Sequence, residues 1–189
     1  MTDTTDTPPP VLLLIDWQKG FRDWDYWGGN RNNPAAEQHA AALLDHWRAK
    51  GWPVAHALHH SLSPDSLLRQ EKPSGAIIPE LAPFGEEAVF VKRQNSAFVG
   101  TDLDGFLRRA QAPQLVIAGL TTNHCVSTTV RMAGNMDYKV RLVGDACATF
   151  DRTGPDGTLY EAALVHAMSL SDLHNEFCQV VATKDLLTP

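Results

Sequence analysis

The sequence lacks several features that would assign a function directly. It has no excess of basic residues, because 16 Lys and Arg stand against 22 Asp and Glu, for a net charge of -6. Nucleic-acid binding needs cationic surface to neutralise phosphates, so nucleic acid is not an expected partner. No apolar run reaches the ~18 residues of a membrane span, and the start MTDTTDTPPP lacks the basic and apolar regions of a signal peptide. We therefore expect a cytoplasmic protein with no membrane partner.

Cysteine and the common catalytic motifs are also scarce. The chain has 3 cysteines, Cys125, Cys147 and Cys178, whose odd number and wide spacing match neither a disulfide framework nor a CxxC zinc pattern. We expect each to be a free thiol. The motifs GxGxxG after a strand, GxxxxGK[ST], HExxH and GxSxG are absent. The sequence therefore gives no support to a dinucleotide-binding protein, a P-loop NTPase, a zinc protease of that type or a serine hydrolase.

What the sequence does have is the composition of a packed globular domain, with 43% hydrophobic and 20% charged residues in a chain of 189. Residues 1–10 are Thr, Asp and Pro and predict a flexible N-terminal arm, followed by a single domain over 11–189. Apolar, strand-like segments cover 11–15, 54–58, 88–91, 115–118, 140–143 and 179–182. Helical segments separate most of them, so the pattern predicts a three-layer α/β/α fold, Rossmann-like, with a six-stranded, mostly parallel sheet.

The helix boundaries carry recognisable signals. Asn33 is expected to cap a helix with Pro34 at its first position, and Gly51 is expected to end it. Thr101 and Asp104 have the spacing of a capping box before a shorter helix. Two further helices are expected over 123–137 and 159–170.

Three chemically capable side chains follow predicted strands. Asp16 comes after the first strand, Lys92 after the third, and Cys125 after the fourth through the turn GLTTNH. In a parallel sheet the ligand site lies at the carboxyl ends of the strands, so we expect these three side chains to meet there. The proline-rich segment 61–87 is a surface excursion of the right length to cover such a site.

The three residue types suffice for acyl transfer. A cysteine in the first turn of a helix is expected to have a lowered pKa, and a nearby Lys ammonium would lower it further. A carboxylate such as Asp16 can remove the thiol proton and return it to a leaving amine, while backbone N–H groups bind the oxyanion. The alternative interpretation is structural: Cys125 is a small buried apolar residue, Asp16 a turn cap and Lys92 a solvated side chain.

Longer strings of sequence favour the catalytic interpretation. The segment LVIAGLTTNHCVSTT at 115–129, with LLLIDWQ at 12–18 and VKRQNSAF at 91–98, resembles the isochorismatase-like cysteine hydrolase family. The similarity extends over about residues 11–183 and includes VRLVGDACATFDRTGPDG and ALVHAMSLSDLHNEF. The resemblance implies the six-stranded fold and a catalytic triad at Asp16, Lys92 and Cys125. It also implies a cis peptide bond between Leu120 and Thr121 that directs backbone N–H groups to the oxyanion.

A metal site is a further possibility that the resemblance raises. Relatives similar to nicotinamidases bind a metal ion through Asp and His after the second strand, where this chain has His56, His59 and His60. The aspartate of that motif is replaced here by Leu58, and two histidines without a carboxylate make an incomplete site. We therefore expect no metal and no cofactor.

Aromatic and amide side chains near the triad are candidates for binding a small-molecule substrate. Trp24 lies in the aromatic loop after Asp16, and Phe98 and Phe150 follow other predicted strands. Gln18 and Asn95 are expected to orient a polar group of the substrate. The aromatic loop is equally well explained as part of an interface, and together with the resemblance it predicts a homo-oligomer, either a dimer or a tetramer.

The sequence thus predicts a cofactor-free cysteine hydrolase that cleaves the carbon–nitrogen bond of a small amide through a thioester on Cys125. One alternative is the vinyl ether hydrolysis that some isochorismatase relatives perform, with Asp16 as the acid. The other is a binding protein that keeps the fold without catalysis. The substrate itself is not fixed by a fold that serves many reactions.

Overall fold

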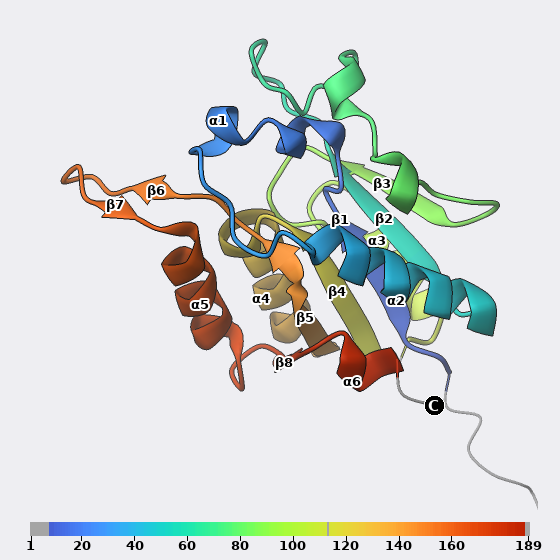
Figure 1. The fold of residues 1–189 in the computed structure, drawn as a ribbon. Helices are drawn as coiled ribbons and strands as arrows, with labels where there is room; N and C mark the ends of the chain where they lie inside the picture. Colours follow the sequence, from blue (N-terminus) through green and yellow to red (C-terminus); the bar gives the residue numbers. More distant parts are fainter. Residues whose placement is uncertain (1–7, 113, 188–189) are drawn as a thin grey trace, which may run out of the picture.

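A six-stranded parallel sheet forms the centre of the computed structural model, which describes residues 8–112 and 114–187. The strands lie in the order β3-β2-β1-β4-β5-β8, and every neighbouring pair is parallel (Figure 1). Their bounds are β1 Val11–Ile15, β2 Val54–His59, β3 Ala88–Lys92, β4 Gln114–Leu120, β5 Lys139–Ala148 and β8 Gln179–Val181. The predicted sheet is confirmed. The predicted N-terminal arm falls mainly on residues 1–7, outside the described residues.

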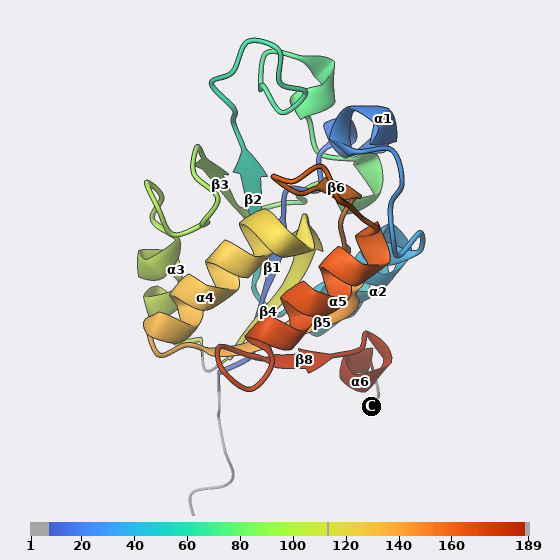
Figure 2. The ribbon, with the colours of Figure 1, turned by 90° about the vertical axis from the view of Figure 1, so that its left-hand side faces the viewer.

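Helices cover both faces of the sheet, which completes the predicted three layers (Figures 1 and 2). On one face lie α3 Leu103–Arg109, α4 Ser127–Asn135 and α5 Ala162–Leu173. On the other lie α2 Ala36–Lys50 and the short α6 Lys184–Leu187. The short α1 Trp24–Trp27 stands beyond the carboxyl end of β1.

The central strand β1 explains why the sheet is buried on both sides. All five of its residues are at most 1% exposed, and they alternate between the two hydrophobic cores. Leu13 packs with α3 and α4, whereas Leu12 and Leu14 pack with α2. Burying each of these side chains contributes roughly 1.5–3 kcal/mol. Gly119 in β4 lets that strand approach β1, because a Cβ there would collide with the carbonyl oxygen of Ile15.

Two predicted helix caps are wrong, although the helices themselves are present. The residue before α2 is Ala35, and Asn33 instead adopts a positive φ of 46° and donates through Nδ2 to the carbonyl oxygens of Gly144 and Cys147. Carbonyl groups of β5 thus accept from the Asn33 side chain, which the local sequence pattern predicts as a cap of the helix. The end of α2 is as predicted, with Gly51 in the left-handed conformation at φ 63°.

The predicted capping box before α3 is also absent. Thr101 Oγ1 accepts from the backbone N–H of Leu103, but Asp104 turns outward to bind Arg108 and Tyr138. Asp104 thus forms a charge-assisted pair with Arg108 and accepts a hydrogen bond from the Tyr138 hydroxyl, and these contacts take the place of a cap on the backbone of α3. The helix Leu103–Arg109 still forms.

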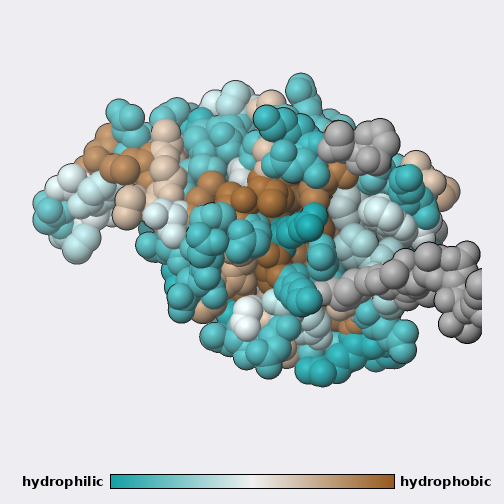
Figure 3. All heavy atoms as spheres, turned by 90° about the horizontal axis from the view of Figure 1, so that it is seen from below, coloured by the Kyte–Doolittle hydropathy of each residue, from teal (hydrophilic) through white to brown (hydrophobic). Residues whose placement is uncertain are grey.

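Two other helices begin later than predicted. The segment Thr122–Val126 is a π-helical turn, and the α-helix α4 starts only at Ser127 and ends at Asn135. Before α5, the residues β7 Leu159–Tyr160 pair with β6 Arg152–Thr153 as a short hairpin. This hairpin projects from the body of the molecule, and seen from below it forms the left-hand extension of the surface (Figure 3).

The excursion between β2 and β3 carries two short 3-10 turns, Pro73–Gly75 and Pro79–Leu81. It passes over the carboxyl ends of the strands on the same side as α1 (Figures 1 and 2). This agrees with its predicted place as a cover. Within residues 8–112 and 114–187, no helix combines the length and the apolar character needed to cross a bilayer.

Candidate active site

Asp16, Lys92 and Cys125 meet at the carboxyl edge of the sheet, as the sequence predicts. Asp16 follows β1 with a φ of 56°, Lys92 is the last residue of β3, and Cys125 lies in the π-helical turn after β4. The Nζ of Lys92 lies 2.8 Å from Oδ2 of Asp16, and both side chains are 0% exposed. A buried ion pair of this kind is stable only when both partners are present, because either charge alone would be strongly destabilising.

The second oxygen of Asp16 is free for a proton. Oδ1 is buried and has no hydrogen-bond partner among the described residues. The carboxylate, Cys125 Sγ and a ring nitrogen of His59 all lie within 4.8 Å of one another. A buried carboxylate that lies close to a thiol and keeps one oxygen without a donor can accept the thiol proton.

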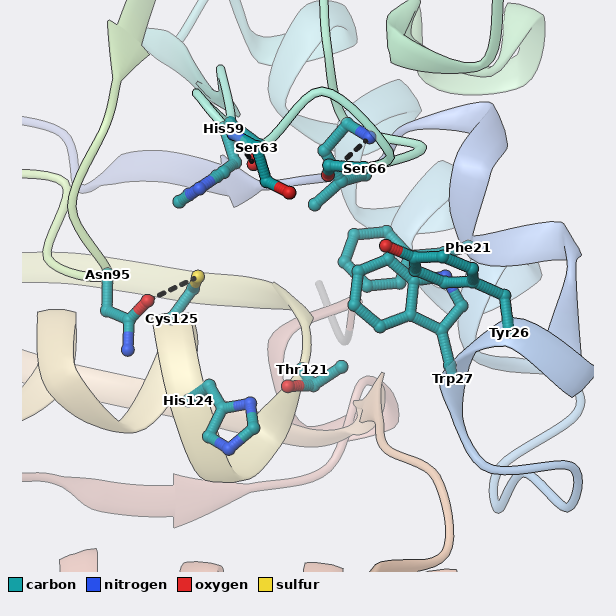
Figure 4. Close-up of a pocket in the computed structure, with 12 residues that line it drawn as sticks. Phe21, Tyr26, Trp27, His59, Ser63, Ser66, Asn95, Thr121, His124 and Cys125 are labelled. Atoms are coloured by element: carbon teal, nitrogen blue, oxygen red, sulfur yellow. Dashed lines mark hydrogen bonds between the residues drawn. The ribbon is translucent and has the colours of Figure 1, made fainter.

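The Cys125 thiol is protonated in the unliganded site. Burial, together with the Asp16 carboxylate, raises its pKa well above the ordinary value, and the nearby Lys92 ammonium only partly offsets this. The expectation that the helix start and Lys92 would lower this pKa is therefore wrong. The physical reason is that Asp16 neutralises Lys92 at 2.8 Å, so the thiolate would be a surplus anion in a buried site. The Sγ–H donates to Oδ1 of Asn95 at 3.8 Å (Figure 4).

His59 belongs to the site, although the sequence suggested it only as a possible metal ligand. Its Nδ1 lies 3.2 Å from the Nζ of Lys92, and its side chain reaches the pocket (Figure 4). Burial, followed by the Lys92 charge, lowers its pKa, so the ring is neutral near pH 7. Since Lys92 can only donate, Nδ1 accepts and Nε2 carries the proton. Its position at the carboxyl end of β2 is the sequence signal that identifies it.

The histidines do not form a metal centre. His56 Nε2 lies 2.9 Å from Glu87, and His60 Nδ1 accepts from the backbone N–H of Gln70, so they face different partners. Among the described residues, the group that could surround a cation is Asp16, His59 and Cys125. The Lys92 ammonium already contacts the first two at 2.8 and 3.2 Å, where a metal ion would have to lie. These residues therefore fit a lysine and do not fit a resident metal.

A small pocket of about 270 Å³ opens above Cys125. This is below the usual range of roughly 300–1,000 Å³ for drug-sized ligands, so the pocket admits only a small molecule. One wall is aromatic, one is made of hydroxyls from the excursion, and the floor carries Cys125 (Figure 4). The lining residues are Phe21, Tyr26, Trp27, His59, Ser61, Ser63, Ser66, Leu68, Asn95, Thr121, His124 and Cys125.

The aromatic wall is a rigid stack. The rings of Phe21 and Trp27 are stacked with centroids 4.5 Å apart, and Tyr26 meets Trp27 edge-on at 4.9 Å. Trp27 Nε1 donates to the carbonyl oxygen of Gly20 at 2.8 Å, which fixes the indole. Phe150 is 2% exposed and stacks behind both rings, at 6.3 and 6.2 Å. A flat apolar group would find a preformed surface here.

The residues predicted to bind substrate have different places. Asn95 lines the pocket, and Phe150 supports the aromatic wall from behind without lining it. Gln18 is 1% exposed and holds the backbone of His59 and Gly75. Phe98 is 8% exposed, packs in the core and stacks on Tyr138. Trp24 is 41% exposed and lines a separate hollow with Arg22 and Glu80.

Contrary to prediction, four of these residues do not line the pocket: Gln18, Trp24, Phe98 and Phe150. The aromatic loop turns so that Trp27, three residues beyond Trp24, supplies the indole that faces the site. Phe98 packs in the core against Tyr138, and the N–H of its neighbour Ala97 donates to Thr129 Oγ1 at 3.0 Å. Neither orientation can be read from residue type alone.

The turn that leads to Cys125 has the conformation implied by the resemblance. The peptide bond between Leu120 and Thr121 is cis, and Thr121 lines the pocket. Thr122 is fully buried, and its hydroxyl lies 2.8 Å from Nδ1 of His166 on α5. The sequence analysis did not foresee His166 as a support for this turn, because the contact joins two distant parts of the chain.

Fold and site together describe a parallel α/β enzyme with a buried Cys, Asp and Lys at the carboxyl edge of its sheet. The family model for the isochorismatase domain matches residues 10–185. The isochorismatase family protein YrdC of Bacillus subtilis is 41% identical over 177 residues, which cover 94% of each chain. The chain therefore belongs to the isochorismatase family, and it is a hydrolase of that family.

Solved structures agree with this assignment. An isochorismatase-family protein from Chromobacterium violaceum has a TM-score of 0.91 and 44% identity, covering 98% of this chain and 95% of its own. A cysteine hydrolase from Pseudomonas syringae pv. phaseolicola has a TM-score of 0.85 and 25% identity, covering 98% and 96%. The three-layer fold predicted from the sequence is confirmed by these similarities.

Proposed function

We propose that this hydrolase cleaves the carbon–nitrogen bond of a small amide through a thioester on Cys125. The observation that carries the proposal is that the two carboxylate oxygens of Asp16 have different surroundings. One carboxylate oxygen is held by Lys92 at 2.8 Å, the other is buried without a donor, and the carboxylate lies within 4.8 Å of the Cys125 sulfur. This is the arrangement that a base needs if it is to take a proton only when the nucleophile attacks.

In the first half of the reaction, Sγ of Cys125 attacks the carbonyl carbon of the amide while the thiol proton moves to Oδ1 of Asp16. The raised pKa of the thiol makes this transfer necessary, since little thiolate exists beforehand. Lys92 remains charged throughout, because the Asp16 carboxylate raises its pKa against the opposing effect of burial. Its positive charge stabilises the negative charge that passes through the site.

The carbonyl oxygen becomes an oxyanion at the turn that follows the cis bond. Backbone N–H groups in the first turn of a helix lack intrahelical acceptors, so this turn offers donors to an anion. Thr121 and Cys125 both line the pocket at this point. When the intermediate collapses, the carbon–nitrogen bond breaks and the proton on Asp16 passes to the departing nitrogen.

In the second half, water attacks the thioester carbonyl. Asp16 Oδ1 takes a proton from that water, the carbon–sulfur bond breaks, and the same proton returns to the sulfur of Cys125. The acid product leaves and the starting state is restored. Asp16 thus serves as base and acid in turn, which requires only that its free oxygen stays close to both the sulfur and the substrate.

The named cysteine hydrolase from Pseudomonas syringae supports the proposal, because its fold matches this chain over 98% of its length. Vinyl ether hydrolysis with Asp16 as the acid, and binding without catalysis, are the two competing functions. Both predict that Cys125 forms no covalent bond with a substrate. The mass of the intact protein therefore separates them from amide hydrolysis.

The test is acid-quenched mass spectrometry of the protein after brief incubation with a panel of small amides. We expect an added acyl mass that maps to Cys125, absent from Cys125→Ala and present in Cys178→Ala, which removes another buried thiol. Hydrolysis of a vinyl ether such as isochorismate by Cys125→Ala at the wild-type rate would favour the ether hydrolase. No adduct, and no turnover of any amide or of the vinyl ether, would leave the binding function as the better account.

A further inference from the structure

The pocket above Cys125 carries no formal charge of its own. Among the described residues that line it, none is a Lys, Arg, Asp or Glu. The polar groups it offers are hydroxyls, such as those of Ser63 and Thr121, the amide of Asn95 and two imidazoles. The chain holds 38 charged side chains, 16 basic and 22 acidic, and none of them is among the described lining residues.

The two imidazoles are neutral near pH 7. His59 accepts a hydrogen bond from Lys92, and burial, followed by that cation, lowers its pKa. Burial, followed by the charge of Arg152, likewise lowers the pKa of His124. Both rings therefore act as neutral hydrogen-bonding groups, and neither supplies a counterion for an anionic ligand.

The floor of the pocket is also neutral overall. Asp16 and Lys92, near Cys125, are paired at 2.8 Å, and neither side chain is exposed. The pair is neutral overall and supplies no net charge to a substrate. Arg152 is the cation coupled to His124, but it stands on the exposed hairpin strand β6 and does not line the pocket. Solvent screens a charge in that position.

An anionic substrate group would therefore exchange its hydration here for neutral donors alone, because no cation lines the pocket. A carboxylate buried without a paired cation is disfavoured. The net charge of -6 on the chain also opposes the approach of anions. A neutral group suffers neither penalty, and a flat one gains contact with the stacked rings of Phe21 and Trp27.

We infer that the substrate is uncharged in the part that enters the pocket, and that it is a small amide with a flat apolar group lying against Phe21 and Trp27. The inference rests on the proposed function for the identity of the reacting bond. The charge preference itself depends only on the pocket, so it can be tested without turnover.

The experiment uses Cys125→Ala protein and two amides of nearly the same shape, 4-nitrobenzamide and 4-carboxybenzamide. They differ by one negative charge, and their dissociation constants can be compared by NMR titration or calorimetry. We expect the nitro compound to bind at least ~10-fold more tightly. Equal affinity, or tighter binding of the carboxylate, would overturn the inference, and so would failure of both amides to bind.

A gain of charge provides the complementary measurement. Ser63 is exposed at the pocket, and its side chain has no hydrogen-bond partner in the described structure, so Ser63→Lys adds a cation without removing a contact. Combined with Cys125→Ala, this change should reduce the preference for the nitro compound by about tenfold. Leu62→Lys, at an exposed neighbour that does not line the pocket, is the matched control. An unchanged preference in Ser63→Lys would count against the inference.

The two proposals fail in different ways. If wild-type protein forms no thioester but Cys125→Ala prefers the neutral amide, the proposed reaction is wrong and the neutral pocket stands. If the thioester forms but the carboxylate binds as well as the nitro compound, the reaction stands and the inference about charge is wrong.

Discussion

Replacing Asp16 by Asn should change two properties of Cys125 in opposite directions. Hydrolysis should fall by at least ~10²-fold, because the base that accepts the thiol proton is lost. Alkylation of Cys125 by iodoacetamide should become faster, because the carboxylate that opposes thiolate formation is gone. A purely structural role for Asp16 would not produce this combination.

The size of the second effect follows from the geometry. A carboxylate oxygen of Asp16 lies at most 4.8 Å from Cys125 Sγ. Two negative charges at that distance repel each other by roughly 3 kcal/mol at an effective dielectric constant of about 20. Removing that repulsion lowers the thiol pKa by ~2 units. The lower pKa increases the thiolate fraction near neutral pH by about 10²-fold, but a less basic thiolate is also a weaker nucleophile, by about tenfold for this change in pKa. We therefore expect alkylation near neutral pH to accelerate about tenfold.

The assay follows the rate of iodoacetamide labelling of Cys125 by peptide mass spectrometry across a range of pH. The control is Asp25→Asn, which removes an exposed carboxylate from α1 and should leave both rates unchanged. Thermal unfolding of each variant shows whether the fold is intact. If Asp16→Asn is folded and its labelling rate is unchanged or slower, the account of the raised thiol pKa is refuted.

Three further outcomes are expected. Burial opposes ionisation of Glu87, but hydrogen bonds from Arg48 and others lower its pKa from 4.5 to about 2. The ionised carboxylate therefore stabilises the fold above pH ~5, and this contribution is lost as the pH falls towards 2. Glu87→Gln should remove up to ~3 kcal/mol of this acid dependence of the unfolding free energy, measured in urea. Trp27→Ala should raise KM about tenfold while Trp24→Ala leaves it within about twofold, since only the first ring lines the pocket. Gln18→Ala should lower the free energy of unfolding by roughly 2–3 kcal/mol in the same assay, because three backbone hydrogen bonds are lost. An unchanged acid dependence in Glu87→Gln, an unchanged KM in Trp27→Ala, or an unchanged free energy of unfolding in Gln18→Ala would contradict the corresponding assignment.

Sequence alone determined the features that depend on local pattern. The buried run Val11–Ile15 reads as a central strand because every residue is apolar, and Gly51 ends α2 because it adopts a left-handed conformation easily. The alternation of such segments predicts the parallel sheet, and a parallel sheet places the residues that follow its strands at one edge. Asp16, Lys92 and Cys125 were found by that rule and by the resemblance of the strings around them.

The tertiary structure decided whatever depends on a partner from elsewhere in the chain. Asn33 leaves its helix because carbonyl groups of β5 accept its amide, and His59 enters the site because Lys92 reaches across the end of β2. The pKa of Cys125 shows the same dependence. Its position in the helix turn predicted a lowered value, but burial and an already neutralised lysine raise it. Local propensity is a property of neighbouring residues, whereas electrostatic and packing energies are set by whichever groups the fold brings within a few ångströms.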